Sequence, residues 1–451
     1  MAQEFIPHSY QKEAINHIVS NKHAGLFLGT GLGKTSILLS AIRALKHKRE
    51  IDRVLIVAPL RVCHLVWPNE IKKWEQFNNL TIEVAHGKNR EKAFQSKADI
   101  VVINPDGLSA MSAMVGSKKF TFRDKNWMLI VDESSNFKNP KTSRFKTLKR
   151  ALGVFGRTVI ATATPAPNGL LQLWSQVYLL DKGERLEKNF TAFRNRYFYQ
   201  SDYMGYTYSP HDWTEKAIYE KIKDIVIHKS SNELDLPERL DNFIPVELDS
   251  KAQKLYKTMK KEMVIELEDS EITAVTAAVV VNKLKQISNG GIYNEEGESI
   301  VIHNEKTKAI EEIVESLGGK PLMVFYEYKH DLERLRKAFP QAKILGEEFE
   351  PTEKLVEDWN NDQVPVFLIQ VQRGSHGLNL QGGSCTDVVW YSIPYDLELY
   401  IQACGRVHRQ GVKNTVIIHH IVCQETIDEK IIGLLKNKTK LQDKLLESLL
   451  V

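Results

Sequence analysis

The sequence predicts an α/β protein with two doubly wound, parallel-sheet lobes and helical insertions. Short apolar runs rich in β-branched residues alternate with amphipathic helical patterns in the first half, and the same alternation returns in the last third. The chain has 451 residues, which is too long for one typical hydrophobic core. Two lobes joined by a mostly helical middle explain both observations.

The first half contains five apolar runs that are typical of central strands in a parallel sheet. Helical patterns separate them. The predicted strands are residues 24–28, 54–58, 100–103, 128–131 and 158–161, and the predicted helices are residues 8–20, 35–47, 67–77 and 142–152.

The second half repeats the rhythm with strands expected at residues 322–326, 366–369, 388–391 and 415–421. Residues 170–310 interrupt it. They are expected to be mostly helical, with an aromatic-rich loop at 196–210. The chain should end in a helix over 424–450, with Leu441, Leu445 and Leu449 on one face. A lobe boundary falls near residues 236–237.

Composition points to a soluble protein: 26% of the residues are charged and 42% are hydrophobic. No apolar run reaches the roughly 20 residues that span a bilayer, and the N-terminus lacks the layout of a secretory signal. The four cysteines are scattered, which argues against a zinc site or disulfides and favours a reducing compartment. The net charge of +4 confines any nucleic-acid footprint to local patches. The densest basic stretch, residues 138–150, fits a solvated helix face or a phosphate-tracking surface.

The segment LGTGLGKTS at residues 28–36 follows the first strand and precedes a helix. Glycines let the backbone wrap a phosphate, Lys34 can reach the β and γ phosphates, and Thr35 can ligate Mg²⁺. Leu28 departs from the Gly or Ala of the strict pattern. The alternative is a glycine-rich turn followed by a chance Lys-Thr pair.

The segment DESSNFKN at residues 132–139 follows the strand predicted at 128–131. In phosphate-loop hydrolases one carboxylate at such a strand end holds Mg²⁺ and the next orients or activates the attacking water. Asp132 and Glu133 suit these roles. Alone, an Asp-Glu pair would more often start a helix, but the phosphate loop about 100 residues earlier favours a catalytic corner.

The segment QACGRVHRQG at residues 402–411 carries Arg406 and Arg409 three residues apart. On a helix, this spacing would align both guanidinium groups on one face, where they could stabilise charge on a γ-phosphate. A basic surface helix is an equal alternative. The glycine-rich segment 372–383 either approaches a phosphate backbone or nucleotide, or forms a turn.

Taken together, these motifs resemble the Swi/Snf-type ATPases of helicase superfamily two, which have two RecA-like lobes. The resemblance runs through most of the chain in the family's order, including PHSYQKEAINHI, LGTGLGKT, INPDGL (103–108), DESSNFKN, ATATPAPN (161–168), KLKQISNGG (283–291), GSHGLNL (374–380) and QACGRVHRQG. Two departures are Ser134-Ser135, where relatives have Ala-His, and Val412, where they have Gln. The resemblance implies lobes at residues 1–235 and 236–451, with helical insertions at about 170–230 and 250–295.

The resemblance implies ATP and Mg²⁺ as cofactors. Gln11 would read adenine through its carboxamide, and Thr35 with Asp132 would hold the metal. The catalytic residues would be Lys34, Asp132, Glu133, Arg406 and Arg409, and the ATP-binding residues Gln11, Gly29, Thr30, Gly31, Leu32, Gly33, Lys34 and Thr35.

The motif positions also imply contacts to DNA and residues that couple ATP state to lobe movement. The DNA candidates are Arg61, Asn104, Lys138 and Arg373, and the coupling candidates are Ser135, Thr162, Thr164, Gly374 and Gln402. Ser135 is shorter than the family's histidine but can still donate and accept a hydrogen bond. The substitution therefore bears on coupling and not on hydrolysis.

The function implied first is a DNA-stimulated ATPase that translocates on double-stranded DNA, with ATP in the cleft between two RecA-like lobes. The alternatives are a strand-separating DNA or RNA helicase, and a nucleic-acid-binding module or ATP switch without hydrolysis. The compact chain resembles bacterial or bacteriophage members. It is expected to be a cytoplasmic monomer that does not associate with membranes and works with or without separately encoded partners.

Overall fold

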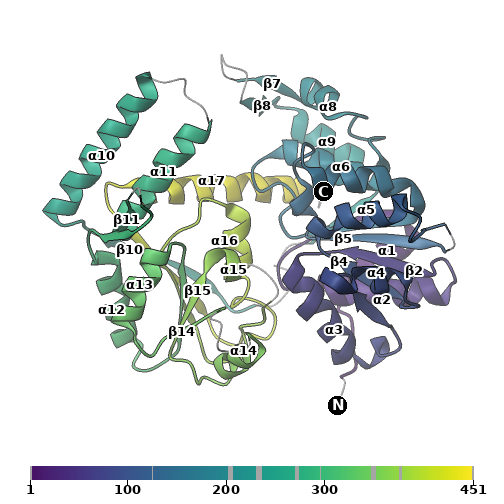
Figure 1. The fold of residues 1–451 in the computed structure, drawn as a ribbon, viewed down its shortest axis with the longest axis horizontal. Helices are drawn as coiled ribbons and strands as arrows, with labels where there is room; N and C mark the ends of the chain where they lie inside the picture. Colours follow the sequence, from purple (N-terminus) through teal and green to yellow (C-terminus); the bar gives the residue numbers. More distant parts are fainter. Residues whose placement is uncertain are drawn as a thin grey trace. The chain divides into compact units, whose positions relative to one another are not determined.

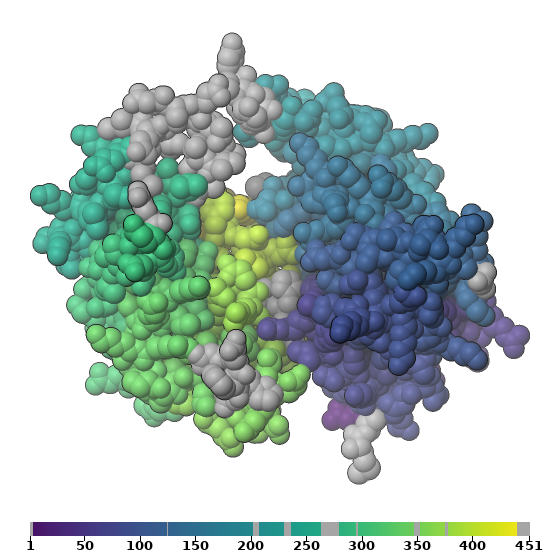
Figure 2. Space-filling model, in the orientation of Figure 1, coloured from purple at the N-terminus to yellow at the C-terminus, as the bar shows by residue number. Residues whose placement is uncertain are grey.

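A computed structural model of the chain describes residues 3–123, 125–201, 207–229, 236–269, 274–294, 296–346, 352–374 and 378–448. The chain divides into two compact units, residues 1–234 with 438–451 and residues 235–437 (Figure 1). Apart from the C-terminal residues, each unit is one continuous stretch of chain, so each shows a narrow range of colours in the space-filling view (Figure 2). Each unit is described below by itself.

The first unit is built on a seven-stranded sheet in the order β3-β4-β2-β5-β6-β1-β9, in which every neighbouring pair is parallel. Its strands are β1 (His23–Leu28), β2 (Arg53–Val57), β3 (Ile82–Val84), β4 (Ile100–Ile103), β5 (Trp127–Asp132), β6 (Phe155–Thr162) and β9 (Val226–Lys229). The central strands are buried on both faces because side chains alternate along them. In β2, Leu55 and Val57 enter one core, while Val54 and Ile56 enter the other.

Helices cover both faces of this sheet (Figure 1). One face packs against α1 (Ser9–Ser20), α2 (Lys34–His47) and α3 (Trp67–Lys73). The other face packs against α4 (Arg90–Gln95), α5 (Leu108–Gly116), α6 (Ser143–Ala151), α7 (Leu173–Asp181), α8 (Phe190–Tyr197) and α9 (Thr214–Ile222). A hairpin of β7 (Phe198–Gln200) and β8 (Tyr208–Pro210) projects from this second layer.

The second unit has a six-stranded parallel sheet in the order β10-β17-β16-β13-β15-β14. Its strands are β10 (Arg239–Val246), β13 (Leu322–Tyr326), β14 (Lys343–Ile344), β15 (Val366–Gln370), β16 (Asp387–Trp390) and β17 (Val416–Cys423). One face packs against α12 (Glu305–Ser316) and α13 (Lys329–Ala338), and the other against α14 (Thr352–Asn360), α16 (Leu397–Cys404) and the start of α17 (Ile427–Ser448). The short helix α15 (Val371–Gly374) follows β15 directly.

A helical pair lies between β10 and α12 in the chain. It consists of α10 (Ser250–Asp269) and α11 (Ala274–Asn289), followed by a hairpin of β11 (Gly291–Tyr293) and β12 (Ser299–Val301). The pair has a small core of its own around Tyr256, Leu284 and Ile287. None of the helices in the described ranges is long and apolar enough to cross a membrane.

The predicted fold class, two doubly wound parallel sheets with helical insertions, is confirmed, and all nine predicted strands are present. Two local expectations are wrong. Residues 170–310 are mostly helical in their described part, but the segment 196–210, expected to be a loop, contains strands β7 and β8, and the edge strands β9 and β10 were not expected. The helix expected at 67–77 ends at Lys73, because Trp74 is extended, and a 3₁₀ turn over Glu75–Phe77 follows. The C-terminal helix is confirmed, while its predicted leucine face lies outside the described side chains.

Candidate nucleotide-binding site

The phosphate loop connects β1 to α2 in the first unit. Gly31 and Gly33 have φ values of 81° and 74°, in the left-handed region that favours glycine. A Cβ on Gly33 would also stand 2.6 Å from Nε2 of Gln11. Gly33 is the N-cap of α2, and the amides of a first helical turn have no partners within the helix. The loop therefore presents donors and a positive helix end, which is how proteins hold phosphate.

Lys34 lies back over its own loop. Its Nζ donates to the carbonyl of Leu28 at 3.0 Å and to that of Gly29 at 3.4 Å. Its positive charge also opposes protonation of Asp132, which lies at the end of β5. The structure thus brings together the lysine and the carboxylate that the sequence placed about 100 residues apart.

Gln11 lies in the first turn of α1 and is buried. Its Oε1 accepts from the backbone N–H of His8 at 2.9 Å, and its Nε2 donates to the carbonyl of Leu32 at 3.2 Å. The side chain therefore reaches the phosphate loop. A purine that engaged both atoms of the carboxamide would replace these two bonds.

Asp132 is the buried member of the acidic corner. Its Oδ2 accepts from the indole N–H of Trp67 at 3.1 Å, and its Oδ1 accepts from the backbone N–H of Glu133 at 3.1 Å. Burial, and then the charge of Glu133, raise the pKa of Asp132 to about 7, against the opposing effects of Lys34 and Trp67. A divalent cation at this position would favour the ionised form.

Glu133 has φ 53° and ψ 60°, a left-handed conformation that is unusual for a residue with a side chain. Such backbone strain persists where the surroundings determine it, often at functional sites. The two adjacent carboxyls differ in environment, because Asp132 is buried and Glu133 is half-buried. Two adjacent carboxyls can therefore take two roles.

A hydrogen-bonded bridge links the acidic corner to the ATATPAPN segment. The hydroxyl of Ser134 donates to Oε1 of Gln176 in α7 at 2.8 Å, and Nε2 of Gln176 donates to the carbonyl of Pro165 at 2.5 Å. Ser135 is fully buried, and its carbonyl accepts from the N–H of Lys138 at 3.1 Å. This bridge runs through Ser134, and the coupling role expected of Ser135 stays a prediction.

The two threonines of the ATATPAPN segment are fully buried at the end of β6. The hydroxyl of Thr162 accepts from the N–H of Thr164 at 3.1 Å. The hydroxyl of Thr164 has no hydrogen-bond partner among the described residues. These contacts hold the turn that leads to Pro165, the residue bridged to Ser134.

The DNA candidates of the first unit all follow carboxyl ends of its strands. Arg61 follows β2, Asn104 follows β4, and Lys138 follows β5. Because parallel strands end at one edge of the sheet, these residues share that edge with the phosphate loop. The side-chain oxygen of Asn104 is buried and has no hydrogen-bond partner within the described part of the chain.

The basic stretch 138–150 forms α6 and the turn before it. Phe145 and Leu148 face the core. Lys149 lies over the ring of Tyr178, with Nζ 4.2 Å from the ring centroid, and Lys146 and Arg150 are exposed. A solvated amphipathic face is therefore present, and its charge is available to a phosphate backbone.

In the second unit, the helical placement expected for the two arginines is wrong, and their action on a γ-phosphate stays a prediction. They do not lie on a helix, because α16 ends at Cys404 and Gly405 caps it. They nevertheless converge on one short segment: Nη1 of Arg406 donates to the carbonyl of Leu378 at 3.2 Å, and Nη1 of Arg409 donates to Oδ1 of Asn379 at 2.6 Å. The convergence comes from tertiary packing and not from helical spacing.

The remaining candidates of the second unit lie near the end of β15. In α15, Arg373 donates to the carbonyl of Gly346 at 3.1 Å. Gly374 packs tightly, since a Cβ there would lie 2.5 Å from Ile369 and 2.8 Å from Phe325. Gln402 is buried in α16 and donates to Glu398 at 3.4 Å. Residues 375–377 of the GSHGLNL segment lie outside the described residues.

The donor set fits Mg²⁺-ATP. Within the described ranges, no group of three or more His, Cys, Asp or Glu side chains could hold a metal by itself. Mg²⁺ in nucleotide sites needs no such cage, because one or two protein oxygens, phosphates and waters complete its shell. Thr35 at the start of α2 and Asp132 at the end of β5 are the residues that would supply those protein oxygens.

Two residues that complete the corner, Trp67 and Gln176, were not expected to belong to the site. The signal for Trp67 is a buried indole N–H, which usually finds an acceptor. Gln176 is a fully buried amide in helix α7, and buried amides bond to polar groups. In both cases the sequence indicates that a partner exists but not which residue it is.

Comparison with known families identifies two matching regions. Residues 10–290 match the SNF2-related domain, and residues 305–411 match the helicase conserved C-terminal domain. A protein named p41 from Acyrthosiphon pisum secondary endosymbiont phage 1 is 34% identical over 467 residues, covering 99% of both chains.

More distant relatives are longer. The uncharacterized ATP-dependent helicase MG018 of Mycoplasma genitalium is 22% identical, covering 97% of this chain and 42% of the relative. The ISWI chromatin-remodeling complex ATPase ISW2 of Saccharomyces cerevisiae is 23% identical, covering 96% of this chain and 40% of the relative. The chain thus spans less than half the length of these two. A solved Sulfolobus solfataricus SWI2/SNF2 ATPase core in complex with dsDNA is 20% identical, with a TM-score of 0.46, covering 98% of this chain and 94% of that one.

Proposed function

The chain belongs to the SNF2-related family of ATP-hydrolysing helicase-type enzymes, and on that premise we propose that it is a motor that translocates on double-stranded DNA. The observation that carries the proposal is the joint presence of Lys34 and Asp132 at one edge of the first sheet, beside a loop whose glycines adopt left-handed conformations. Each of these features serves phosphoryl transfer.

The residues of the first unit have distinct tasks in this proposal. The loop amides and Lys34 bind the phosphates, while Thr35 and Asp132 hold the metal. Glu133 orients the attacking water and accepts its proton. Bound Mg²⁺ would neutralise charge that develops on the phosphate oxygens. Trp67 holds Asp132 in place through the indole N–H.

Arg406 and Arg409 would act on the same reaction from the second unit. Their convergence on residues 378–379 gives two guanidinium groups one shared anchor, which suits a pair that stabilises the γ-phosphate together. Cyclic engagement of the arginines would couple hydrolysis to movement along DNA.

Double-stranded DNA is the proposed track, held through its phosphates by Arg61, Asn104, Lys138 and Arg373. Contacts of this kind carry little sequence information. The chain would work as a monomer in the cytoplasm, with or without separate protein partners. These partner and location expectations rest on the family resemblance.

Triplex displacement tests the proposal. A radiolabelled third strand on a duplex track should be released when ATP is supplied and retained with a non-hydrolysable analogue. A forked duplex of the same length, run in parallel, should stay paired. If the fork is separated and the triplex persists, the enzyme is a strand-separating helicase instead. If DNA does not stimulate ATP hydrolysis at all, the chain is not a motor.

A further inference from the structure

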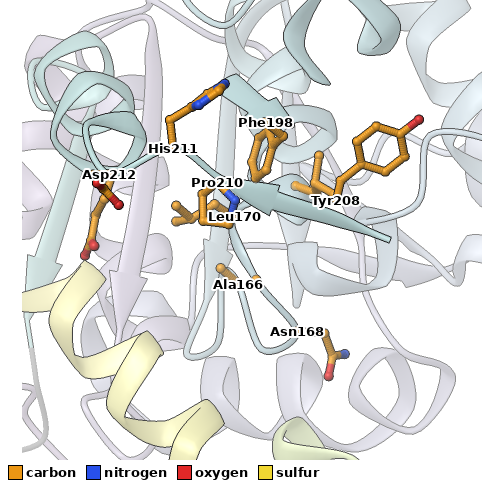
Figure 3. Close-up of a pocket in the computed structure, with 11 residues that line it drawn as sticks. Ala166, Asn168, Leu170, Phe198, Tyr208, Pro210, His211 and Asp212 are labelled. Carbon is orange, nitrogen blue, oxygen red and sulfur yellow. The ribbon is translucent and has the colours of Figure 1, made fainter. Parts of the chain in front are cut away.

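A cavity of about 350 Å³ lies in the first unit, away from the phosphate loop (Figure 3). Three segments line it: the turn at residues 166–171 after the ATATPAPN segment, the β7–β8 hairpin, and residues 210–215 before and in α9. Leu170, Phe198 and Pro210 lie together at its centre, with Ala166 beside them (Figure 3). A concave, mostly apolar site of this size accommodates a small ligand or one or two large side chains.

The charge at the rim of this cavity is negative. Asp212 and Glu215 line it, and no lysine or arginine is among the described residues that do. Asp212 is exposed and Glu215 is half-buried. The nearby Arg194 is engaged, with its guanidinium 4.3 Å from the ring centroid of Tyr208. An occupant with a cationic group would be attracted, and a phosphate backbone would be repelled.

An aromatic stack, defined as Tyr199, His211 and Trp213, adjoins the cavity. The ring of His211 is stacked on that of Trp213 at 5.4 Å, with the planes 4° apart, and contacts the tilted ring of Tyr199 at 5.3 Å. Tyr199 and Trp213 are each 49% exposed. Large aromatic side chains that remain exposed beside a pocket are typical of protein interaction sites, where tyrosine, tryptophan and arginine anchor the contact.

Hydrogen bonds connect the cavity to the acidic corner within the same unit. Nε2 of Gln176, which Ser134 bonds, donates to the carbonyls of both Pro165 and Gln172. Oε1 of Gln172 in turn accepts from the backbone N–H of Asn168 at 3.1 Å. Ala166 and Asn168 line the cavity. A ligand that shifts this turn therefore acts on the residue next to Glu133.

We propose that this cavity and its aromatic stack bind a basic peptide segment of a partner protein, which inserts a large apolar side chain into the cavity and places an arginine against Asp212 and Glu215. The bound peptide alters ATP turnover through the Gln176 bridge, a consequence that rests on the proposed function. Arginine is the cation best suited to the site, because its planar group stacks on aromatic rings while it pairs with carboxylates.

Binding is tested with two fluorescein-labelled dodecapeptides in a Gly-Ser background, one with a central Arg-Leu-Arg-Trp and one with Glu-Leu-Glu-Trp. Fluorescence anisotropy should show binding of the first at least about tenfold tighter than the second. Glu215→Lys should weaken binding of the basic peptide by a similar factor. Glu220→Lys, an exposed position on α9 outside the cavity, should leave it unchanged within about twofold. Equal binding of the two peptides, or equal effects of the two variants, would overturn the proposal.

Leu170→Trp should fill the cavity and abolish peptide binding. Circular dichroism should show whether this variant folds. If it does not fold, the Glu215→Lys variant still tests the proposal. A fluorescein-labelled dT12 oligonucleotide is the alternative ligand in the same assay. If it binds the wild-type protein and this binding is lost in Leu170→Trp, the cavity is a nucleic-acid site and the peptide assignment is wrong.

The regulatory step has a separate readout. Saturating basic peptide should change the DNA-stimulated ATPase rate at least about twofold, and Gln176→Leu should remove this change while peptide binding persists. An unchanged rate with bound peptide refutes the coupling and leaves the site intact. Absence of any ATPase activity refutes the proposed function instead, because the anisotropy assay requires no hydrolysis.

Discussion

Lys34 carries the sharpest prediction at the scale of single residues. Lys34→Ala should reduce ATP turnover on the order of 10²–10³-fold, since it removes the positive charge that faces the phosphates. DNA binding, measured by anisotropy, should persist. Lys48→Ala at the other end of α2 is the matched control and should retain full turnover. Normal hydrolysis by the Lys34 variant would show that residues 28–36 are not the phosphate-binding loop.

Ser134 and Ser135 form a natural matched pair. Ser134→Ala breaks the bridge to Gln176, so we expect near-normal DNA-stimulated hydrolysis but at least about threefold slower triplex displacement. The bridge makes Ser134 a second candidate for coupling beside Ser135. A translocation defect confined to Ser135→Ala would assign the role to Ser135 alone.

His303 links the stability of the second unit to pH. Burial lowers the pKa of His303 to about 4, while an unfolded histidine has a pKa near 6.5. Between these values the unfolded chain binds a proton that the folded chain does not. The free energy of unfolding should therefore fall as the pH drops, by about 2 kcal/mol from this group between pH 7 and pH 5.

Urea unfolding at pH 7 and pH 5 measures this effect. His303→Gln should flatten the dependence by that amount, whereas His47→Gln, at an exposed position of α2, should keep the wild-type dependence. An identical pH dependence in all three proteins would show that His303 does not become protonated on unfolding.

At the scale of elements, a buried ion pair ties three helices of the second unit together. Nζ of Lys306 in α12 lies 2.7 Å from Oδ2 of Asp428 in α17, with both side chains fully buried. Ser288 and Asn289 at the end of α11 bond to this pair. The helical pair α10–α11 is thus anchored to the core of the unit by polar contacts.

Breaking one side of this pair should be costly. Lys306→Met should lower the free energy of unfolding by about 3–5 kcal/mol, because it leaves Asp428 buried and uncompensated. Lys308→Met is the control, since Lys308 is exposed and pairs with Glu305 on the same helix, and it should leave the free energy of unfolding nearly unchanged. Equal losses in urea unfolding would mean that burial does not matter at this pair.

Strands could be predicted from the sequence where every residue of the strand is buried, because such a strand is apolar at every position. Residues 100–103 and 322–326, apolar on every position, coincide with β4 and β13. The edge strands β9 and β10 were missed because one face of such a strand stays wet and its pattern mixes polar with apolar residues, as in RLDNFIPV. Arg406 and Arg409 were placed on a helix because spacing alone cannot show that Gly405 ends it.

The limits of local sequence patterns also explain which residues of the site could be predicted. Asp132, Glu133 and Lys34 could be predicted because they occupy fixed places after strands. Trp67 and Gln176 could not, because their partners lie 65 and 42 residues away. Such contacts depend on how α3 and α7 pack on the sheet, and no local pattern records that packing.

At the scale of the whole molecule, DNA affinity should depend steeply on salt. If Arg61, Lys138 and Arg373 each neutralise one phosphate, the logarithm of the binding constant should fall against the logarithm of salt concentration with a slope of at least about −2.7, at roughly −0.9 per contact. Lys138→Ala should reduce the slope by about 1 on every duplex sequence. Anisotropy titrations from low to moderate salt measure both. A salt-independent affinity would exclude phosphate tracking.

The family match and the structural units divide the chain differently. The SNF2-related domain ends at residue 290, after α11, while the first compact unit ends at residue 234. The pair α10–α11 therefore belongs by sequence family to the first region and by packing to the second unit. Variants for separate study of the units should keep α11 with the second unit, in which Asn289 bonds to Lys306.

Gln11 has a consequence for which nucleotides the enzyme can use. Its carboxamide donates a hydrogen bond to the carbonyl of Leu32, and its Nε2 occupies the space that a side chain on residue 33 would need. A base that hydrogen-bonds to the carboxamide would also break the bond between Gln11 and the loop. The loop would then change shape only when such a base is bound. A pyrimidine triphosphate would bind without breaking this hydrogen bond. Selectivity for adenine would appear in the rate of turnover as well as in affinity.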